Sequence, residues 1–532
     1  MLIKRQSFSV LFVATLLLVG CDHNGSSSDD SAGIGTEDGV TPSQPQNPDR
    51  STERGVTPSQ PQNLDRSCDE AAYPSAEWTA CEAANYAKVL EATTEQLSPD
   101  FDSRWVAQSA ANLQAWTERS LADPSWLSPL SGNTPVTPLC TTWSLQCTGD
   151  PFRYPTVDGP DGRTFYENEA EVIPVVFYDD GCARLSGRVW APKGSAGKRL
   201  PAVVIENGSI QAPETAYWWA AQLLVRAGYV VLTFDPRGQG RSDLQTPTLG
   251  QGGNINADVF VTGLVNAIDF FRSTPATPYP WNQSCAATYP TAVNEHNPFH
   301  DRIDPERLGI TGHSAGAIGA SIVAGFGAPG ADVWPGLLDT DNPVDALVAW
   351  DPLVSGSTLL LPSRFAVPRV PGLGLVGDYI SADGINRDLL TGVFTLIPNV
   401  VPPNPKQNLK LAYNDYVAAG IPVYSLTIAG ATHFDFSQVP TFPATSWCPD
   451  TSSGNCEGGW GIGVIEHYTL AWFDRWLKKP GEPGYADADQ RLVDDAGPDG
   501  ATKLSFHYHS ARAYTDRSGK WQLCEDIRAG CP

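Results

Sequence analysis

Residues 307–316, RLGITGHSAG, carry the most information about the fold. An apolar run ends in the pentapeptide G-x-S-x-G, and a small-residue pattern typical of a helix follows it. A strand, a serine on a sharp turn and then a helix form the context in which this motif marks a nucleophile. The flanking glycines leave room for a strained turn that exposes the hydroxyl. The stretch therefore predicts that Ser314 is a nucleophile at the end of a strand.

Apolar runs and helical patterns alternate along the chain around this motif. Predicted strands cover residues 172–178, 183–190, 200–205, 228–234, 346–350, 370–376 and 423–428, and predicted helices cover 215–227, 258–272 and 465–477. The first two strands, joined by a turn at 179–181, are expected to form an antiparallel edge. The alternation predicts an α/β fold with a mostly parallel central sheet and helices on both faces.

Two stretches resemble the α/β-hydrolase superfamily, and the resemblance extends over residues 171–477. One is the serine turn at 312–316, and the other is DPRGQGRS at 235–242, a D-x-R-G-x-G-x-S run. Part of the chain is also similar to the cutinase-type polyester hydrolases, through the tryptophans at 218–219 and the Trp-Asp pair at 350–351. The resemblance implies an α/β-hydrolase fold and a serine hydrolase that needs no metal or organic cofactor.

The serine needs a base to take its proton, and the base needs an acid partner. In α/β-hydrolases the chain order is serine, acid, histidine. His433 directly follows the last predicted parallel strand, where the resemblance places the histidine. His467 falls inside a predicted helix, and His507 and His509 fall in the C-terminal tail. We therefore expect His433 to be the base.

Three aspartates are candidates for the acid. Asp378 follows the strand at 370–376 directly and is the predicted acid, with a role as a turn cap as the alternative. Asp383 would take the role if a longer loop follows that strand. Asp351 comes one strand earlier, at a position that carries the acid in some lipases of the superfamily.

The tetrahedral oxyanion needs two N–H donors in fixed positions. Ala315, at the start of the helix after the serine, is expected to supply one. The other is expected from the turn after residue 205, with Ser209 preferred and Gly208 next. Asp235 and Arg237 are expected to hold their loop in place rather than to touch substrate.

The N-terminus has the pattern of an export signal. Lys4 and Arg5 precede an apolar stretch at 10–19, and LVGC at 18–21 resembles the bacterial lipobox, in which the cysteine is lipidated. An ordinary signal peptide with an incidental cysteine is the alternative. The pattern predicts a lipoprotein anchored to the lipid bilayer through Cys21, in the bacterial cell envelope, facing the periplasm or the exterior.

The cysteine count fits an oxidising compartment. Of 11 cysteines, setting Cys21 aside leaves ten, an even number. The expected pairs are Cys68 with Cys81, Cys140 with Cys147, Cys448 with Cys456, Cys524 with Cys531, and, over a long range, Cys182 with Cys285. Because no C-x-x-C or clustered Cys/His spacing occurs, no metal site is expected.

Composition excludes one class of partner. The formal net charge is −24 and the pI is about 4.6, whereas a protein that binds a phosphate backbone needs a basic face. Nucleic acid is therefore not expected as a partner.

The chain divides into five predicted parts. They are a signal peptide (1–20), a low-complexity tether (21–66) in which GVTPSQPQN occurs twice, a helical extension that serves as a cap or lid (67–150), a catalytic domain (151–480) and a tail (481–532) with one added strand at 504–508 and a short disulfide loop. The tether contains too few apolar residues to offset the entropy cost of ordering it.

The expected activity is hydrolysis of a carboxylic ester through an acyl-enzyme, with a small-molecule or polymer ester as substrate. A serine peptidase or amidase would use the same triad, because fold does not settle substrate. A surface binding protein with an inactive triad is the alternative outside enzymes.

Overall fold

The structure is a computed structural model. It describes residues 75–77, 80, 121–124, 163–209, 214–253, 255–379, 410–433, 436–437, 462–494, 504, 510–527 and 530–531. The predicted signal peptide, the tether and the helical extension lie almost entirely outside these residues. No helix in the described ranges is both long and apolar enough to cross a membrane.

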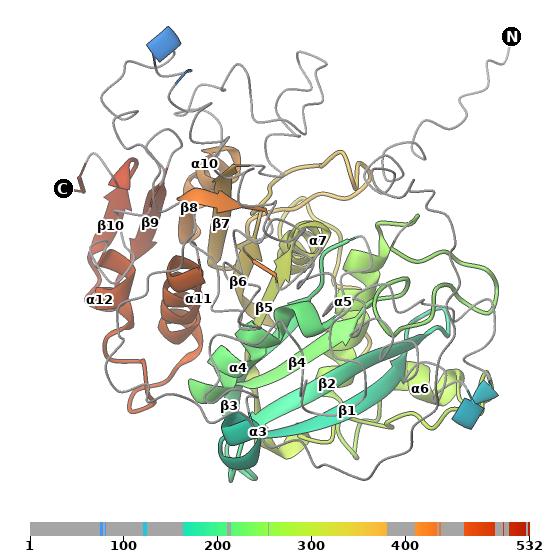
Figure 1. The fold of residues 1–532 in the computed structure, drawn as a ribbon. Coiled ribbons are helices and arrows are strands. Elements are labelled where there is room, and N and C mark those ends of the chain that lie inside the picture. Colours follow the sequence, from blue (N-terminus) through green and yellow to red (C-terminus); the bar gives the residue numbers. More distant parts are fainter. Residues whose placement is uncertain are drawn as a thin grey trace, which may run out of the picture. The chain divides into compact units, whose positions relative to one another are not determined.

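A mixed sheet of ten strands organises the described part of the chain (Figure 1). Its strands, in chain order, are β1 (Ala170–Tyr178), β2 (Arg184–Pro192), β3 (Leu200–Glu206), β4 (Val230–Asp235), β5 (Ile303–His313), β6 (Val344–Trp350), β7 (Gly372–Tyr379), β8 (Val423–Thr432), β9 (Ala511–Thr515) and β10 (Trp521–Cys524). Their order across the sheet is β1-β2-β4-β3-β5-β6-β7-β8-β9-β10. The six strands from β4 to β8 in that order are parallel, and β1 and β2 form the predicted antiparallel edge. The α/β class predicted from the alternation is confirmed.

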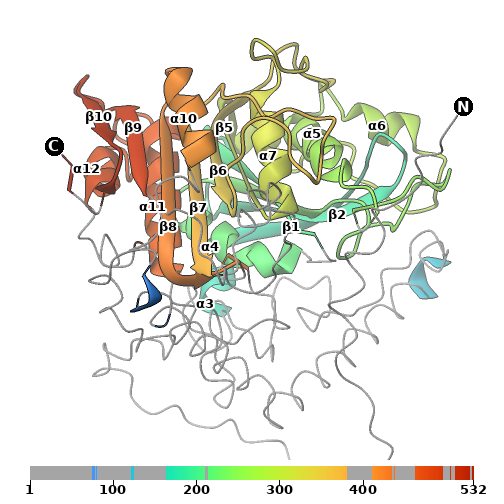
Figure 2. The same cartoon turned by 90° about the horizontal axis from the view of Figure 1, so that it is seen from above.

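Helices cover both faces of the sheet. They are α3 (Arg163–Asn168), α4 (Trp218–Arg226), α5 (Val259–Arg272), α6 (Pro280–Ser284), α7 (Ala315–Gly325), α10 (Lys410–Ala418), α11 (Ile462–Leu477) and α12 (Ala488–Val493), with short 3₁₀ helices η5 (Glu214–Tyr217) and η6 (His300–Arg302). Residues of α4 and α11 share one apolar cluster, and residues of α5, α7 and α10 share another. Figure 2 shows α5 and α7 on one side of the sheet and α4 on the other.

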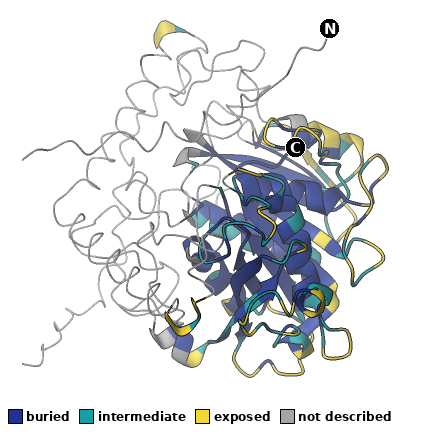
Figure 3. Ribbon diagram, turned by 90° about the vertical axis from the view of Figure 1, so that its right-hand side faces the viewer, coloured by how far each residue is buried: buried dark blue, intermediate teal, exposed yellow. Residues whose placement is uncertain are grey.

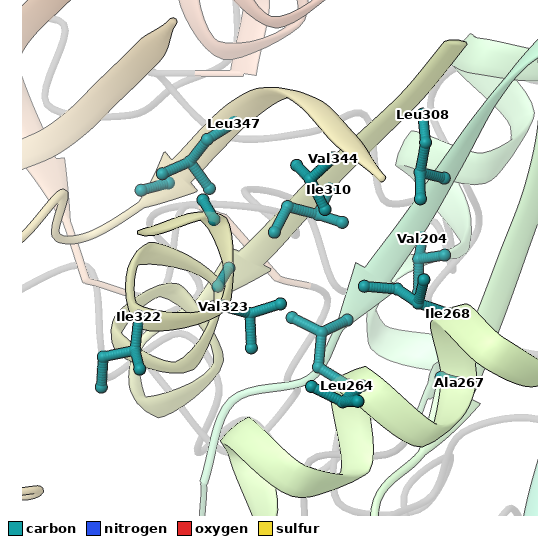
Figure 4. Close-up of a cluster of buried hydrophobic side chains, with 14 of the residues drawn as sticks. Val204, Leu264, Ala267, Ile268, Leu308, Ile310, Ile322, Val323, Val344 and Leu347 are labelled. Atoms are coloured by element: carbon teal, nitrogen blue, oxygen red, sulfur yellow. The ribbon is translucent and has the colours of Figure 1, made fainter. Parts of the chain in front are cut away.

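The parallel strands read as continuous apolar runs because they are buried on both faces. Figure 4 shows the core between the sheet and the two helices α5 and α7, where Val204 of β3 and Ile310 of β5 lie near Leu264 and Val323. In Figure 3 the strands and their covering helices are buried, and exposure is concentrated in the connecting loops. This core holds the ends of the parallel strands in a fixed arrangement.

The C-terminal tail contains two strands that were not predicted from the sequence, β9 and β10, and they extend the sheet. Leu504 makes an isolated bridge to Ile428, and the rest of the strand predicted at 504–508 lies outside the described residues. Strand β9 pairs with β8, so the sheet continues past the predicted boundary at residue 480. The tail is therefore part of the same sheet as the catalytic segment.

Two of the predicted disulfides are present. Cys182 in the β1–β2 turn is bonded to Cys285 at the end of α6, with a sulfur–sulfur distance of 1.99 Å. Cys524 is bonded to Cys531. The other three predicted pairs lie outside the described residues.

Candidate active site

Ser314 occupies a strained turn between β5, which ends at His313, and α7, which begins at Ala315. Its backbone dihedrals are φ 56° and ψ −120°, a conformation that residues with a side chain rarely adopt. The motif glycines are required by contact: a Cβ atom at Gly312 would lie 2.3 Å from the Gly316 carbonyl oxygen. A Cβ atom at Gly316 would lie 2.2 Å from the Asn207 carbonyl oxygen. The half-buried serine therefore has the strand, turn and helix that the motif predicted.

His433 lies directly after β8 and is held by a buried carboxylate. Its Nδ1 atom is 2.7 Å from Oδ2 of Asp351, so Nδ1–H donates to that oxygen. Asp351 has an exposed fraction of 0%, and its Oδ1 atom has no hydrogen-bond partner among the described residues. The histidine is therefore the single hydrogen-bonding contact of this carboxylate within the described part of the chain.

The prediction that Asp378 is the acid is wrong, because Asp351 occupies that position. Asp378 lies in β7, and the next residue, Tyr379, still pairs with Thr432 of β8. Its side chain and the whole of Asp383 lie outside the described residues. The third candidate of the sequence, one strand earlier, is the residue that contacts the histidine.

The register of β5 and β6 explains how Asp351 reaches the site. His313 pairs with Trp350, and the Ser314 N–H donates to the Trp350 carbonyl oxygen at 3.0 Å. Asp351 directly follows that residue and has a positive φ of 48°. The acid and the nucleophile therefore both leave adjacent strands at the same level of the sheet.

The three predicted oxyanion donors lie at the starts of two turns. Ala315 is the first residue of α7, so its N–H has no partner within the helix. Gly208 and Ser209 follow the end of β3 at Glu206. The Gly208 N–H donates to the Tyr217 hydroxyl at 2.9 Å, which favours Ser209 as the second donor. The oxyanion roles of these residues stay predictions.

Two further residues, His313 and Tyr217, lie at this site and were not predicted from the sequence. The His313 Nδ1 atom is 2.9 Å from the Tyr217 hydroxyl, and its Nε2 atom is 2.7 Å from the His433 carbonyl oxygen. Burial, together with the neighbouring charge of His433, holds the pKa of His313 well below its usual value of 6.5. The one available signal was that a polar histidine fills the variable position before the serine, at the end of a buried strand.

Asp235 and Arg237 hold their loop, as predicted. Asp235 accepts hydrogen bonds from Asn207 Nδ2, from the Glu214 N–H and from the Arg241 N–H, at 2.6–2.9 Å. Burial and the neighbouring charge of Glu214 raise the pKa of Asp235 to about 6. Neither residue contacts Ser314, Asp351 or His433 in any hydrogen bond.

Arg237 points away from the triad, toward the β1–β2 turn. Its Nη1 atom is 2.5 Å from Oδ2 of Asp179, and both side chains are nearly buried. Oδ1 of Asp179 accepts two further hydrogen bonds, from the Gly181 and Ala183 N–H groups. Burial raises the pKa of Asp179 to about 6 although Arg237 and these two donors lower it.

His467, another histidine considered in the sequence, does not join the site. His467 donates from Nε2 to the Arg491 carbonyl oxygen at 2.9 Å, a structural contact in α11. His507 and His509 lie outside the described residues. Among the residues that are described, no group of three or more His, Cys, Asp or Glu side chains is placed to hold a metal ion.

Comparison with known proteins adds no relative. No protein-family model matches the chain, and no curated protein matches it. The geometry of Ser314, His433 and Asp351 therefore carries the case for function.

Proposed function

We propose that this protein has an α/β-hydrolase fold and is a serine hydrolase that cleaves carboxylic esters through an acyl-enzyme. The observation that carries the proposal is the buried Asp351 carboxylate, 2.7 Å from His433 Nδ1, beside a serine in a strained turn. His313, the residue before that serine, lies with its ring 4.6 Å from the ring of His433. Nucleophile, base and acid thus leave β5, β8 and β6 at one end of the sheet, in the roles that a triad requires.

In the first half of the reaction, Ser314 Oγ attacks the ester carbonyl carbon while His433 Nε2 takes the hydroxyl proton. Asp351 keeps the histidine proton on Nδ1, so that Nε2 is free to accept, and stabilises the imidazolium that forms. The oxyanion of the tetrahedral intermediate accepts hydrogen bonds from the Ala315 and Ser209 N–H groups. The carbon–oxygen bond then breaks, and the leaving alcohol receives the proton from His433.

In the second half, water replaces the alcohol. His433 takes a proton from the water as it attacks the acyl carbon, and the carboxylic acid leaves as Ser314 regains its proton. Every step uses side chains and backbone groups of this chain.

Two other functions are the alternatives to ester hydrolysis. The same triad would serve a peptidase or amidase, because fold does not settle substrate, and the substrate test below separates these activities. A binding protein without activity would have no need to keep a buried carboxylate on His433. The lipobox-like LVGC at 18–21 extends the proposal to an exported, lipid-anchored enzyme of the bacterial envelope.

The test is turnover of a short p-nitrophenyl ester together with labelling by a fluorophosphonate, which reacts with activated serines. We expect Ser314→Ala to lower kcat by more than about 10³-fold and to abolish labelling. Ser284→Ala is the matched control, because Ser284 is exposed and distant in sequence from the triad. Undiminished turnover by Ser314→Ala would overturn the proposal, and cleavage of a peptide library in place of the ester would select the peptidase.

A further inference from the structure

A chain of hydrogen bonds links three segments of the candidate site. The Gly208 N–H, after β3, donates to the Tyr217 hydroxyl at 2.9 Å. That hydroxyl lies 2.9 Å from Nδ1 of His313, and Nε2 of His313 lies 2.7 Å from the His433 carbonyl oxygen. The side chains of Tyr217 and His313 thereby join three segments. These are the oxyanion turn at 207–209, the serine turn at 312–316 and the loop that begins at His433.

The direction of each hydrogen bond in this chain is fixed by chemistry. A carbonyl oxygen can only accept, so the proton of a neutral His313 lies on Nε2. Nδ1 of His313 is then an acceptor and receives a hydrogen bond from the Tyr217 hydroxyl. The hydroxyl oxygen is free to accept from Gly208, and every donor in the chain meets an acceptor.

Burial keeps His313 in this neutral form. Its side chain is 4% exposed, and the Tyr217 side chain is fully buried. Burial holds the pKa of His313 well below 6.5, and the neighbouring His433 lowers it further. The pKa of Tyr217 is raised by burial, so its hydroxyl keeps the proton that it donates. His313 is therefore neutral, so it adds no positive charge beside His433.

Gly208 packs tightly against the side chains of Tyr217 and His313. A Cβ atom at this position would lie 2.9 Å from the Tyr217 hydroxyl oxygen and 3.1 Å from Nδ1 of His313. The oxyanion turn therefore lies directly against both side chains. Ser209, the predicted second oxyanion donor, is the next residue.

We propose that Tyr217 and His313 are positioning residues, which hold the oxyanion turn and the His433 loop in register with Ser314. This inference rests on the proposed function. The two side chains touch no reacting atom, and their effect is on the placement of groups that do. Misplacement of such groups by a fraction of an ångström lowers the rate of the chemical step more than it weakens binding of the ground state.

The first test is Tyr217→Phe, which keeps the ring and deletes the hydroxyl. It leaves the Gly208 N–H and Nδ1 of His313 without their partner. We expect kcat per active site to fall by about tenfold or more while KM stays within about twofold. Active sites are counted by fluorophosphonate titration, so that any loss of folded protein does not enter the comparison.

Tyr229→Phe is the matched control. Tyr229 is also fully buried, and its hydroxyl also donates to a buried partner, Asp474 Oδ1 at 2.7 Å, but it packs near α11 away from the triad. A general effect of deleting a buried hydroxyl would appear equally in both variants. We expect Tyr229→Phe to lower the melting temperature without changing kcat per titrated site.

A pair of substitutions at His313 tests the other half of the chain. His313→Phe removes both hydrogen bonds, and we expect a fall in kcat of about tenfold to a hundredfold. His313→Gln keeps a carbonyl oxygen to accept from Tyr217 and an amide N–H₂ to donate to the His433 carbonyl, so we expect it to recover part of that loss. A trifluoromethyl ketone, which forms a tetrahedral adduct with the serine, should bind more weakly to Tyr217→Phe and His313→Phe in proportion to their loss of kcat.

The outcomes separate this inference from the proposed function. If the unmodified protein neither turns over esters nor reacts with the fluorophosphonate, the proposed function fails. If it does both, and kcat per titrated site is unchanged in Tyr217→Phe and His313→Phe, the positioning role fails and the triad stands. A KM that rises with kcat unchanged would also overturn it, since that pattern indicates a loss of ground-state binding.

Discussion

Two buried carboxylates in this protein sit in opposite kinds of surroundings. In the triad corner, defined by Ser314, Asp351 and His433, Asp351 has one oxygen on the histidine and the other without a partner in the described residues. In the edge corner, defined by Asp179, Cys182 and Arg237, the carboxylate of Asp179 accepts from one guanidinium and two backbone N–H groups.

The difference shows how to tell a functional carboxylate from a structural one. Asp179 accepts hydrogen bonds from Arg237 and from two backbone N–H groups, and these contacts stabilise the turn. The described hydrogen bond of the Asp351 carboxylate goes to His433, a side chain that changes its protonation state in the proposed mechanism. The charged run DPRGQGRS makes Arg237 conspicuous in the sequence, whereas Asp351 and His433 form the candidate site.

The largest expected effect is in the triad corner. Asp351→Asn places an amide N–H₂ against Nδ1 of His433 and favours the tautomer whose Nε2 carries the proton and cannot accept another. We expect kcat to fall by about 10⁴-fold with little change in stability. Asp378→Asn is the control, with an expected loss of tenfold or less, roughly the effect of one local hydrogen bond. Reversal of this order in p-nitrophenyl ester turnover would restore Asp378 as the acid.

The second expected effect is on the stability of the edge corner. Replacing both Cys182 and Cys285 by alanine opens a loop of sequence separation 103, and we expect the free energy of unfolding to fall by about 5 kcal/mol. Removing Cys524 and Cys531, of sequence separation 7, should cost only about 2 kcal/mol. Urea unfolding of the two double variants measures the difference, and equal losses would contradict the dependence on loop length.

The third prediction separates Arg237 from catalysis. Arg237→Met leaves the buried Asp179 without its counter-charge, so we expect unfolding to become easier by about 3 kcal/mol. Activity per titrated site should stay within about twofold. Arg226→Met is the control, because the pair of Arg226 with Glu169 lies at the surface and should contribute about 0–1 kcal/mol. A large fall in kcat for Arg237→Met would place Arg237 in the site.

The smallest effect concerns Glu206, the last residue of β3. Both of its carboxyl oxygens are buried without a hydrogen-bond partner among the described residues. Burial, joined by the neighbouring charge of Asp235, raises the pKa of Glu206 well above 4.5. The unfolded chain therefore releases this proton at a lower pH than the folded protein does, and stability falls as pH rises above about 4.5.

Glu206→Gln removes this titration. We expect the loss of stability between pH 5 and pH 8 to be smaller in the variant than in the unmodified protein. Urea midpoints at the two pH values measure it. An equal slope in both proteins would show that Glu206 is already ionised in the folded state.

Local pattern predicted most of the sheet but not the identity of the acid. Apolar runs such as residues 200–205 and 228–234 predicted strands because a parallel strand is buried on both faces. The small-residue motif predicted the serine turn because the backbone lies too close to Gly312 and Gly316 to leave room for side chains. Ser314 and His433 follow from motif and position in the chain.

The errors came from contacts between distant residues. Asp351 follows β6 and Asp378 lies near the end of β7, and the folded chain places Asp351 against Nδ1 of His433. The hydrogen bond between Tyr217 and His313 joins residues that are 96 positions apart. The local pattern of apolar and polar residues does not reveal a contact of this kind. The strand β9, ARAYT, has no marked alternation, and its burial comes from pairing with β8. Tertiary context set each of these outcomes.

The extension of the sheet by β9 and β10 bears on the order in which the protein is made. The ribosome finishes β8 about eighty residues before β9, and until then the backbone of β8 on its outer side presents free N–H and C=O groups. An edge of that kind invites pairing with another nascent copy. Strands β9 and β10 therefore complete the sheet late in synthesis. A chain terminated after residue 510 would lack the pairing of β9 with Val423, Tyr424 and Ser425 of β8, and we expect it to aggregate more readily.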